Sequence, residues 1–147
     1  MRRSEPSSVP TMNLTTNILL TGSTGYVGGL LRAHLEALPH VRVRCLVRDR
    51  RHVSTQGSRA TLIVGDLLQP ATLEPAMEGI EIAYYMVHSM GSSGSFEEMD
   101  RRAAHHFGWA ARQAGVRRII YLGGLGGGDD LSTHLRSRQE VGAILAT

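Results

Sequence analysis

Three glycines, Gly22, Gly25 and Gly28, have a spacing that could support the binding of a phosphorylated ligand. They follow the apolar run NILLT and precede apolar residues at helical spacing, so they form a corner between a strand and a helix. At such a corner the first glycine permits a tight turn and the second lets the backbone approach a pyrophosphate. The third lets the helix pack closely on the strand. Free N–H groups at the start of the helix would face the anion. The alternative is a tight turn with no ligand.

The basic residues limit what other chemistry this chain can perform. All 16 are arginines and lysine is absent, which excludes a lysine that binds phosphate, forms a Schiff base or acts as a general acid. Arginine favours bidentate recognition of phosphate or carboxylate. The net charge of +3 is compatible with nucleic acid, but aromatic residues make up only 5% of the chain. They form no basic stacking surface, so we expect no nucleic-acid partner.

Strands and helices alternate along the chain and must position this corner. Each predicted strand is a short apolar or β-branched run, and each predicted helix has apolar residues at helical spacing. The predicted strands are residues 17–22, 41–47, 59–66, 80–88 and 116–124, and the predicted helices are residues 26–38, 70–79, 96–114 and 132 onward. This order indicates parallel βαβ units and a doubly wound α/β sheet.

The ends of the chain give three further expectations. Residues 1–13 are rich in Ser and Pro and are expected to form a disordered leader, with one folded domain over residues 14–147. No strand follows the last helix, so we expect the first part of a longer fold that lacks the usual C-terminal strands and substrate region. The exposed sheet edge and the apolar long helix favour a homodimer.

No apolar run is long enough to cross a membrane, and the single Cys45 favours a reduced, cytoplasmic protein.

The long helix over residues 96–114 offers no metal site. His105 and His106 are adjacent and so lie on different helical faces, without further ligands at a convergent spacing. Phe107 and Trp109 are expected to be core or oligomer-contact residues. A run of charged residues near the start of this helix is expected to form a solvated face with weak local ion pairs. These residues are Glu97, Glu98, Asp100, Arg101 and Arg102.

Four motifs together resemble a known family. The segments TGSTGYVGG, CLVRD, VGDLLQP and AGVRRIIYLGGLG are similar to those of extended and atypical short-chain dehydrogenase/reductases, with NmrA-like and sugar-nucleotide-epimerase-like proteins as the nearest branch. The resemblance implies an NAD(P)-binding Rossmann domain with strand order 3-2-1-4-5. It also implies that Ser23, Thr24, Tyr26 and Val27 complete the phosphate loop around the three glycines.

The resemblance places cofactor selection at the end of the second strand. Arg48 stands where such proteins recognise the adenosine ribose, and an arginine there would pair with the 2′-phosphate of NADP. Asp49 stands beside it and would instead favour the free 2′-hydroxyl of NAD. Because Arg50 and Arg51 add positive charge, we expect NADP as the cofactor, with NAD as the alternative. Arg50 and Arg51 could also simply be solvated.

Two other strand ends are assigned cofactor contacts by the resemblance. Asp66 and Leu67 would border the adenine, although Asp66 could equally cap the next helix. Val87 and His88, with Met86 before them, would line the ribose and nicotinamide. His88 could also be a loop histidine with no role in catalysis.

The catalytic residues typical of this superfamily are replaced. Reductases of this type use a Tyr-x-x-x-Lys pair and a serine or threonine after the fifth strand, but Gly123 or Gly124 stands at the hydroxyl position and only His134 and Arg138 match the spacing. His134 could donate a proton and Arg138 could hold a ribose hydroxyl, or both could lie on an exposed helix face. The resemblance thus implies an oxidoreductase or epimerase with an unknown carbonyl or hydroxyl substrate, or a non-catalytic NAD(P)-binding sensor.

Overall fold

Five parallel strands form one sheet in the order β3-β2-β1-β4-β5. The computed structural model describes residues 14–89, 96–126 and 131–147. The strands are β1 (Thr16–Thr21), β2 (Val41–Val47), β3 (Thr61–Val64), β4 (Ile82–Tyr85) and β5 (Arg118–Tyr121). The helices are α1 (Tyr26–Glu36), α2 (Leu73–Met77), α3 (Phe96–Gln113) and α4 (Thr133–Leu145). The expected Rossmann strand order is therefore confirmed.

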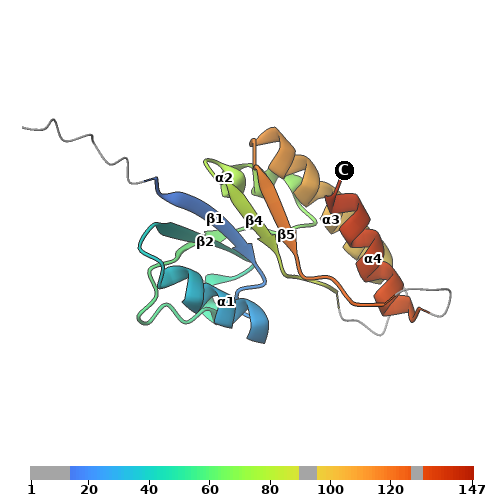
Figure 1. Ribbon diagram of the computed structural model, residues 1–147, viewed down its shortest axis with the longest axis horizontal. Helices are drawn as coiled ribbons and strands as arrows, with labels where there is room; N and C mark the ends of the chain where they lie inside the picture. Colours follow the sequence, from blue (N-terminus) through green and yellow to red (C-terminus); the bar gives the residue numbers. More distant parts are fainter. Residues whose placement is uncertain (1–13, 90–95, 127–130) are drawn as a thin grey trace, which may run out of the picture.

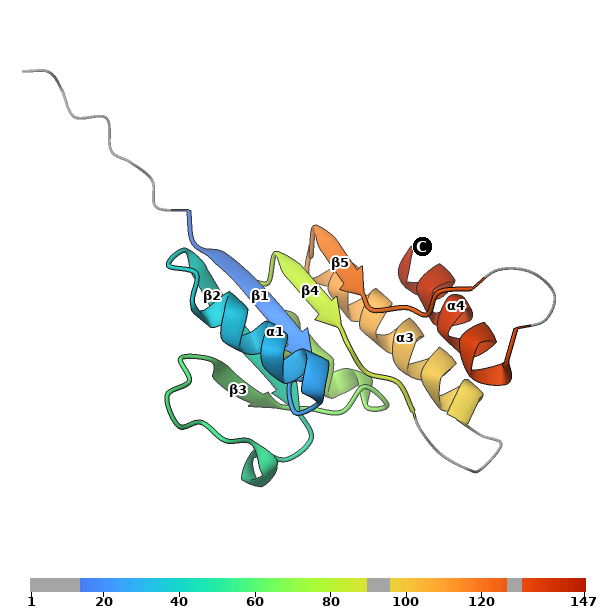
Figure 2. The ribbon, with the colours of Figure 1, turned by 60° about the horizontal axis from the view of Figure 1, so that its bottom comes forward.

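Helices cover both faces of this sheet (Figures 1 and 2). Strand β1 supplies side chains to both layers. Ile18 and Leu20 point to the side of α1, whereas Leu19 points to the side of α2 and α3, because successive strand residues face opposite ways. On the second side Phe107 of α3 is fully buried. Its ring meets Tyr85 of β4 edge-on, with 4.9 Å between the ring centroids. Burial on both faces explains the continuous apolar run over residues 18–20 in the centre of β1.

Helix α4 lies alongside α3 in both views (Figures 1 and 2). Arg101 of α3 joins the two helices through Glu140, with 2.8 Å from its Nε to Oε1. It also pairs with Glu98 on its own helix. The hydroxyl of Tyr121 donates to the carbonyl oxygen of Arg138 and so links β5 to α4. The segment after β5 is thereby held over the same face of the sheet as α3.

Several strands are shorter than the apolar runs predicted. The fourth run was expected to continue to His88, but β4 ends at Tyr85. A parallel strand continues only as far as its neighbours pair with it, and β4 pairs with β1 as far as Tyr84 and with β5 as far as Tyr85. The residues after Tyr85 leave the sheet and line a cavity at its edge. A 3₁₀ turn at Arg50–His52 was not expected from the sequence.

The structure corrects two expectations about the long helix. Of the two alternatives for Trp109, the core one is wrong, since 60% of its surface is exposed, and the oligomer contact stays a prediction. Trp109 lies two residues beyond Phe107, which puts it on the outer side of the helix. Asp100 does not belong to a solvated face, since it is only 6% exposed. It lies four residues after Phe96 and three before Ala103, both buried, so it falls on the inner stripe.

The leader expected over residues 1–13 lies outside the described residues. Residues 90–95, after β4, and residues 127–130, before α4, also lie outside them. Among the residues that are described, no helix is both long and apolar enough to cross a membrane. The same part of the chain contains no group of three or more acidic, histidine or cysteine side chains that could hold a metal ion.

Candidate functional site

The carboxyl ends of β1, β2, β3 and β4 border one cavity of about 760 Å³. It lies at the point where the chain order of the sheet reverses, between β1 and β4, which is where open α/β sheets bind their ligands. Thr21 joins these two strands, because its hydroxyl donates to the carbonyl of Tyr84 and accepts from the N–H of Met86. The cavity is lined by Thr21, Gly22, Thr24, Leu46, Val47, Arg48, Asp49, His52, Gly65, Asp66, Leu67, Leu68, Tyr85, Val87, His88, Ser89, Met99, Asp100 and Ala103.

Close backbone contacts require glycine at two of the three positions in the corner. Gly22 has a φ of +70°, and a Cβ there would lie 2.7 Å from the carbonyl oxygen of Met86. A Cβ on Gly28 would lie 2.0 Å from the carbonyl oxygen of Gly22, so α1 can pack on the corner only with glycine there. These two contacts would also explain a simple tight turn. Gly25 is different, because a Cβ there would meet only the oxygen of Gly22, at 3.4 Å.

The start of α1 leaves donors available at this corner. Gly25 is the N-cap residue and offers no side chain to the N–H groups of the first turn, which also contains no acidic residue. The N–H groups of Tyr26, Val27 and Gly28 have no partner within the helix. Next to them the buried hydroxyl of Ser23 has no hydrogen-bond partner within the described part of the chain. A corner with open space and unsatisfied donors fits a pyrophosphate.

The side chains of the predicted phosphate loop do not all face the cavity. Thr24 lines it, whereas Ser23 is buried behind the corner. Tyr26 is 84% exposed and Val27 about half exposed, and neither side chain is among the lining residues. A cofactor contact by Tyr26 or Val27 would therefore come from the backbone, and their cofactor role stays a prediction.

Arg48 and Asp49 both line the cavity after β2, but only one has a partner. The Asp49 carboxylate accepts from the guanidinium and the backbone N–H of Arg51, and the pKa of Asp49 is held below its ordinary value by these bonds. Arg50 donates to the carbonyl oxygen of Leu62, 2.8 Å away. No hydrogen bond or ion pair joins Arg48 to another described residue. Arg48 thus remains available for a ligand phosphate.

Asp66 and Leu67 lie at the cavity after β3. One carboxylate oxygen of Asp66 accepts from the N–H of Leu68 at 2.9 Å and closes a local turn. Asp66 does not cap the next helix, because the N-cap residues are Gln69 for the 3₁₀ turn Pro70–Thr72 and Thr72 for α2. The second oxygen accepts no hydrogen bond within the described residues. The ring Nδ1 of His106 hydrogen-bonds the carbonyl oxygen of Leu67 at 2.8 Å and ties this loop to α3. The expectation of a helix cap is therefore wrong, and the adenine contact of Asp66 stays a prediction.

The far end of the cavity contains residues that sequence reasoning did not select. Val87 and His88 lie there as expected, together with Ser89, Met99 and Asp100. The Asp100 carboxylate accepts from the backbone N–H of Ser89 at 2.7 Å. The signal in the sequence was the position of this carboxylate on the apolar stripe of α3, where a charged residue is unusual.

His134 and Arg138 do not line this cavity. The imidazole of His134 stacks on Phe96, with 4.6 Å between the ring centroids. Arg138 donates to the carbonyl oxygens of Leu122 and Gly123, at 2.6 and 3.0 Å, and so supports the segment that leaves β5. Their catalytic role stays a prediction, and these contacts describe structural roles.

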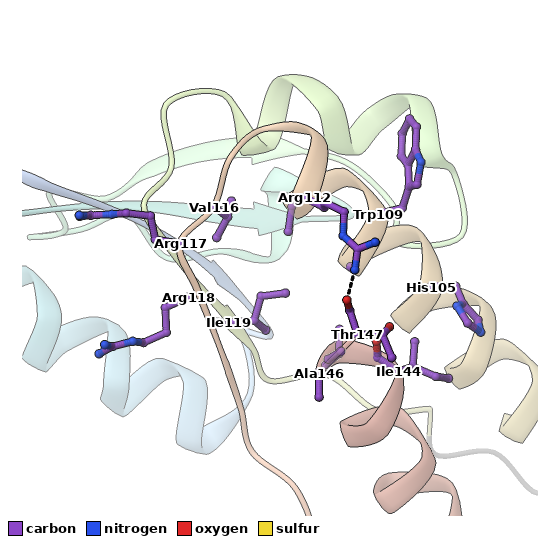
Figure 3. Close-up of a pocket in the computed structure, with 13 residues that line it drawn as sticks. His105, Trp109, Arg112, Val116, Arg117, Arg118, Ile119, Ile144, Ala146 and Thr147 are labelled. Carbon is purple, nitrogen blue, oxygen red and sulfur yellow. Dashed lines mark hydrogen bonds between the residues drawn. The ribbon is translucent and has the colours of Figure 1, made fainter.

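A second cavity, of about 560 Å³, lies at the opposite end of the strands (Figure 3). Trp109 and Arg112 of α3, Arg118 at the start of β5 and Thr147 surround it. Arg112 donates to the carbonyl oxygen of Thr147, as the dashed line in Figure 3 marks. This cavity contains no residue of the glycine corner, so the site at the carboxyl ends of the strands is the candidate functional site.

Comparison with known proteins supports the cavity at the carboxyl ends of the strands as the candidate functional site. The sequence profile described as NAD(P)H-binding matches residues 22–147, which begin at the first glycine of the corner. This chain belongs to the NAD(P)H-binding family. The match confirms the resemblance to NAD(P)-binding short-chain dehydrogenase/reductases and the expectation of a nicotinamide dinucleotide as cofactor.

This chain aligns with only part of the length of each similar protein. Sanguinarine reductase from Eschscholzia californica is 40% identical over 65 residues, which are 44% of this chain and 24% of that protein. The triphenylmethane reductase of Citrobacter sp. complexed with NADP(H) has a TM-score of 0.75 and 23% identity, over 89% of this chain and 45% of its own. An NADPH-dependent quinone oxidoreductase from Escherichia coli has a TM-score of 0.72 and 22% identity, over 88% of this chain and 44% of its own. The chain therefore spans less than half of each.

Proposed function

We propose that this chain is the cofactor-binding part of an NADPH-dependent reductase. The observation that carries the proposal is the contrast between two neighbours after β2. Asp49, which would accept from the free ribose hydroxyl of NAD, already binds Arg51, whereas the guanidinium of Arg48 is free of ion pairs among the described residues. A free guanidinium at this strand end suits a 2′-phosphate.

Each part of the cavity has a task in this proposal. The first-turn N–H groups of α1 hold the pyrophosphate, and Arg48 holds the 2′-phosphate. The free carboxylate oxygen of Asp66 accepts from the adenine amino group. Val87 and His88 border the nicotinamide, and Thr21 holds the ends of β1 and β4 together beneath it. When bound, NADPH supplies a hydride to an organic acceptor.

Three of the similar proteins support reduction as the reaction, although a nucleoside-diphosphate-sugar epimerase from Staphylococcus aureus has a similar fold, with a TM-score of 0.75. Sanguinarine reductase, triphenylmethane reductase and the quinone oxidoreductase all carry reduction in their names, and two of them are complexed with NADP(H) or NADPH. The acceptor differs among all three. We therefore propose that an organic molecule accepts the hydride, and its chemical class stays open.

A second candidate is an NADPH-binding sensor without catalysis. One observation favours it: the residues at the Tyr-x-x-x-Lys spacing, His134 and Arg138, make contacts away from the cavity. A protein of this kind would bind NADPH and change its interactions without transferring hydride.

Binding and turnover can be separated with one cofactor. The fluorescence of NADPH is followed as protein is added, and then its absorbance is followed in the presence of quinone, aldehyde and iminium acceptors. A reductase enhances the fluorescence and then oxidises NADPH faster than buffer does with one acceptor class. Saturable binding without accelerated oxidation by any class would favour the sensor. No binding would contradict both.

A further inference from the structure

Two imidazoles line this cavity among the described residues, those of His52 and His88. His52 follows β2, and its Nε2 lies 3.8 Å from Oδ2 of Asp49, so it belongs to the end of the cavity that contains Arg48. His88 follows β4, which lies on the other side of β1 in the sheet. The two histidines therefore lie on opposite sides of the glycine corner, and His88 lies at the end assigned to the nicotinamide.

The backbone is anchored on both sides of His88. The N–H of Met86 donates to the hydroxyl of Thr21 in β1 at 3.0 Å. The N–H of Ser89 donates at 2.7 Å to the carboxylate of Asp100 in α3, which is only 6% exposed. The imidazole of His88 is itself exposed and makes no hydrogen bond or ion pair with another residue that the structure describes. The sheet and a helix thus fix the backbone that carries this imidazole at the edge of the cavity.

The other titratable groups of this lining are less suited to donate a proton at the same end. Tyr85 lies there, but burial, and then the negative charge of Asp100, raise the pKa of its phenol above the ordinary value, so its proton is given up less readily. The Asp100 carboxylate is itself an acceptor. The remaining ionisable groups of the lining follow β2 and β3, and they are Arg48, Asp49, His52 and Asp66. An imidazole gives up and regains a proton near neutral pH, so His88 is the donor that this end of the cavity provides.

We propose that His88 is the catalytic proton donor of this site and protonates a carbonyl acceptor as that acceptor is reduced. The inference rests on the proposed reductase function. When bound, NADPH is oxidised as its hydride forms a C–H bond at the carbonyl carbon or a carbon conjugated with it, and the displaced electron pair passes to the carbonyl oxygen. The N–H bond of the His88 imidazolium breaks and its proton forms an O–H bond with that oxygen, which leaves an alcohol or an enol and a neutral imidazole. Because this side chain is exposed, water can return the proton before the next turnover.

One test measures binding at both ends of the cavity without turnover. Imidazole NMR signals of the original chain that are absent from His88→Gln or from His52→Gln are assigned to those two residues. NADP, which cannot supply hydride, is expected to shift both sets of signals and to leave in place those of His105, an exposed residue of α3 outside this cavity lining. Signals of His88 that stay in place while those of His52 move would overturn the proposal. If neither set moves, the proposed function is contradicted instead.

A second test follows the oxidation of NADPH by aldehyde and quinone acceptors in the original chain, in His88→Gln and in His105→Gln, the same substitution outside the site. The kcat of the original chain and of His105→Gln is expected to fall as the pH rises from about 6 to about 9, because the donor must be protonated.

His88→Gln is expected to lose about a hundredfold in kcat at neutral pH, together with most of this pH dependence, while its NADPH affinity changes by less than about twofold. An unchanged kcat or pH profile in His88→Gln would overturn the proposal. Turnover confined to iminium acceptors, whose reduction takes up no proton, would overturn it as well. Bound NADPH that no acceptor oxidises would contradict the proposed function, and this role of His88 with it.

Discussion

Arg51 occupies the carboxylate of Asp49, with its Nη2 2.6 Å from Oδ2 and its backbone N–H 2.9 Å from Oδ1. The two residues are separated by a single residue, and Asp49 caps the short 3₁₀ turn that contains Arg51. The pair removes an acceptor that would otherwise favour NAD and leaves Arg48 as the free charged group after β2. In the proposed function, selection of the cofactor would therefore depend on Arg51, which is not among the residues that line the cavity.

Arg51→Ala is expected to shift the cofactor preference toward NADH. The freed carboxylate of Asp49 would repel the 2′-phosphate of NADPH and accept from the hydroxyl of NADH. The ratio of the NADPH affinity to the NADH affinity should fall by about three- to tenfold. The change is modest because the Asp49–Arg51 pair is exposed. Fluorescence titration with both cofactors measures it. An unchanged ratio would mean that Asp49 lies too far from the ribose. Arg42→Ala, at an exposed position in β2 outside the cavity lining, is the control.

The close packing of α1 on the glycine corner predicts opposite effects of two adjacent substitutions. Gly28→Ala should destabilise the protein by at least about 2 kcal/mol, since its Cβ would lie 2.0 Å from a backbone oxygen. At Gly29 the nearest atom would be 3.6 Å away, so Gly29→Ala should be neutral or stabilise by up to about 1 kcal/mol. Urea unfolding of both variants tests this. Equal effects would contradict the described packing.

The two aromatic residues of α3 should differ strongly in their contribution to stability. Phe107 is fully buried against Tyr85, and Phe107→Ala is expected to cost about 3–5 kcal/mol of unfolding free energy. Trp109 is mostly exposed, and Trp109→Ala should change it by less than about 0.5 kcal/mol. Thermal or urea denaturation measures both. A large loss for Trp109→Ala that depends on protein concentration would instead indicate an interface between copies.

The sequence predicted the strands and the glycine corner of this site better than the contacts of its charged residues. The alternation of apolar runs was sufficient to predict a parallel α/β sheet, and the positions of Gly22, Gly25 and Gly28 were sufficient to predict the corner, because both follow from local pattern and handedness. The strand order came from the family resemblance. The burial of Asp100 was missed, since its neighbours in the sequence are charged and only its helical phase indicates that it faces inward. The Asp49–Arg51 pair was missed because both alternatives for that loop treated its charges as independent.

Because of Cys45, the free energy of unfolding should depend on pH in the alkaline range. The thiol is fully buried, and burial raises its pKa above the ordinary value. The unfolded chain releases this proton at the ordinary pKa while the folded chain keeps it, so stability should fall as pH rises above that value. Tyr85, whose pKa is also raised, acts in the same direction at higher pH. Urea unfolding from pH 7 to about pH 10 should show a smaller decrease for Cys45→Ala than for the original chain. Identical slopes would contradict this assignment.

We propose that Arg48 recognises the 2′-phosphate of NADPH, and calorimetric titration of the original chain and of Arg48→Ala can decide whether it does. The original chain is expected to bind NADPH more tightly than NADH. Arg48→Ala is expected to lose about 1.5–3 kcal/mol of binding free energy with NADPH, as for a charge-assisted bond, and little with NADH. Equal affinities for the two cofactors, unchanged in the variant, would contradict it.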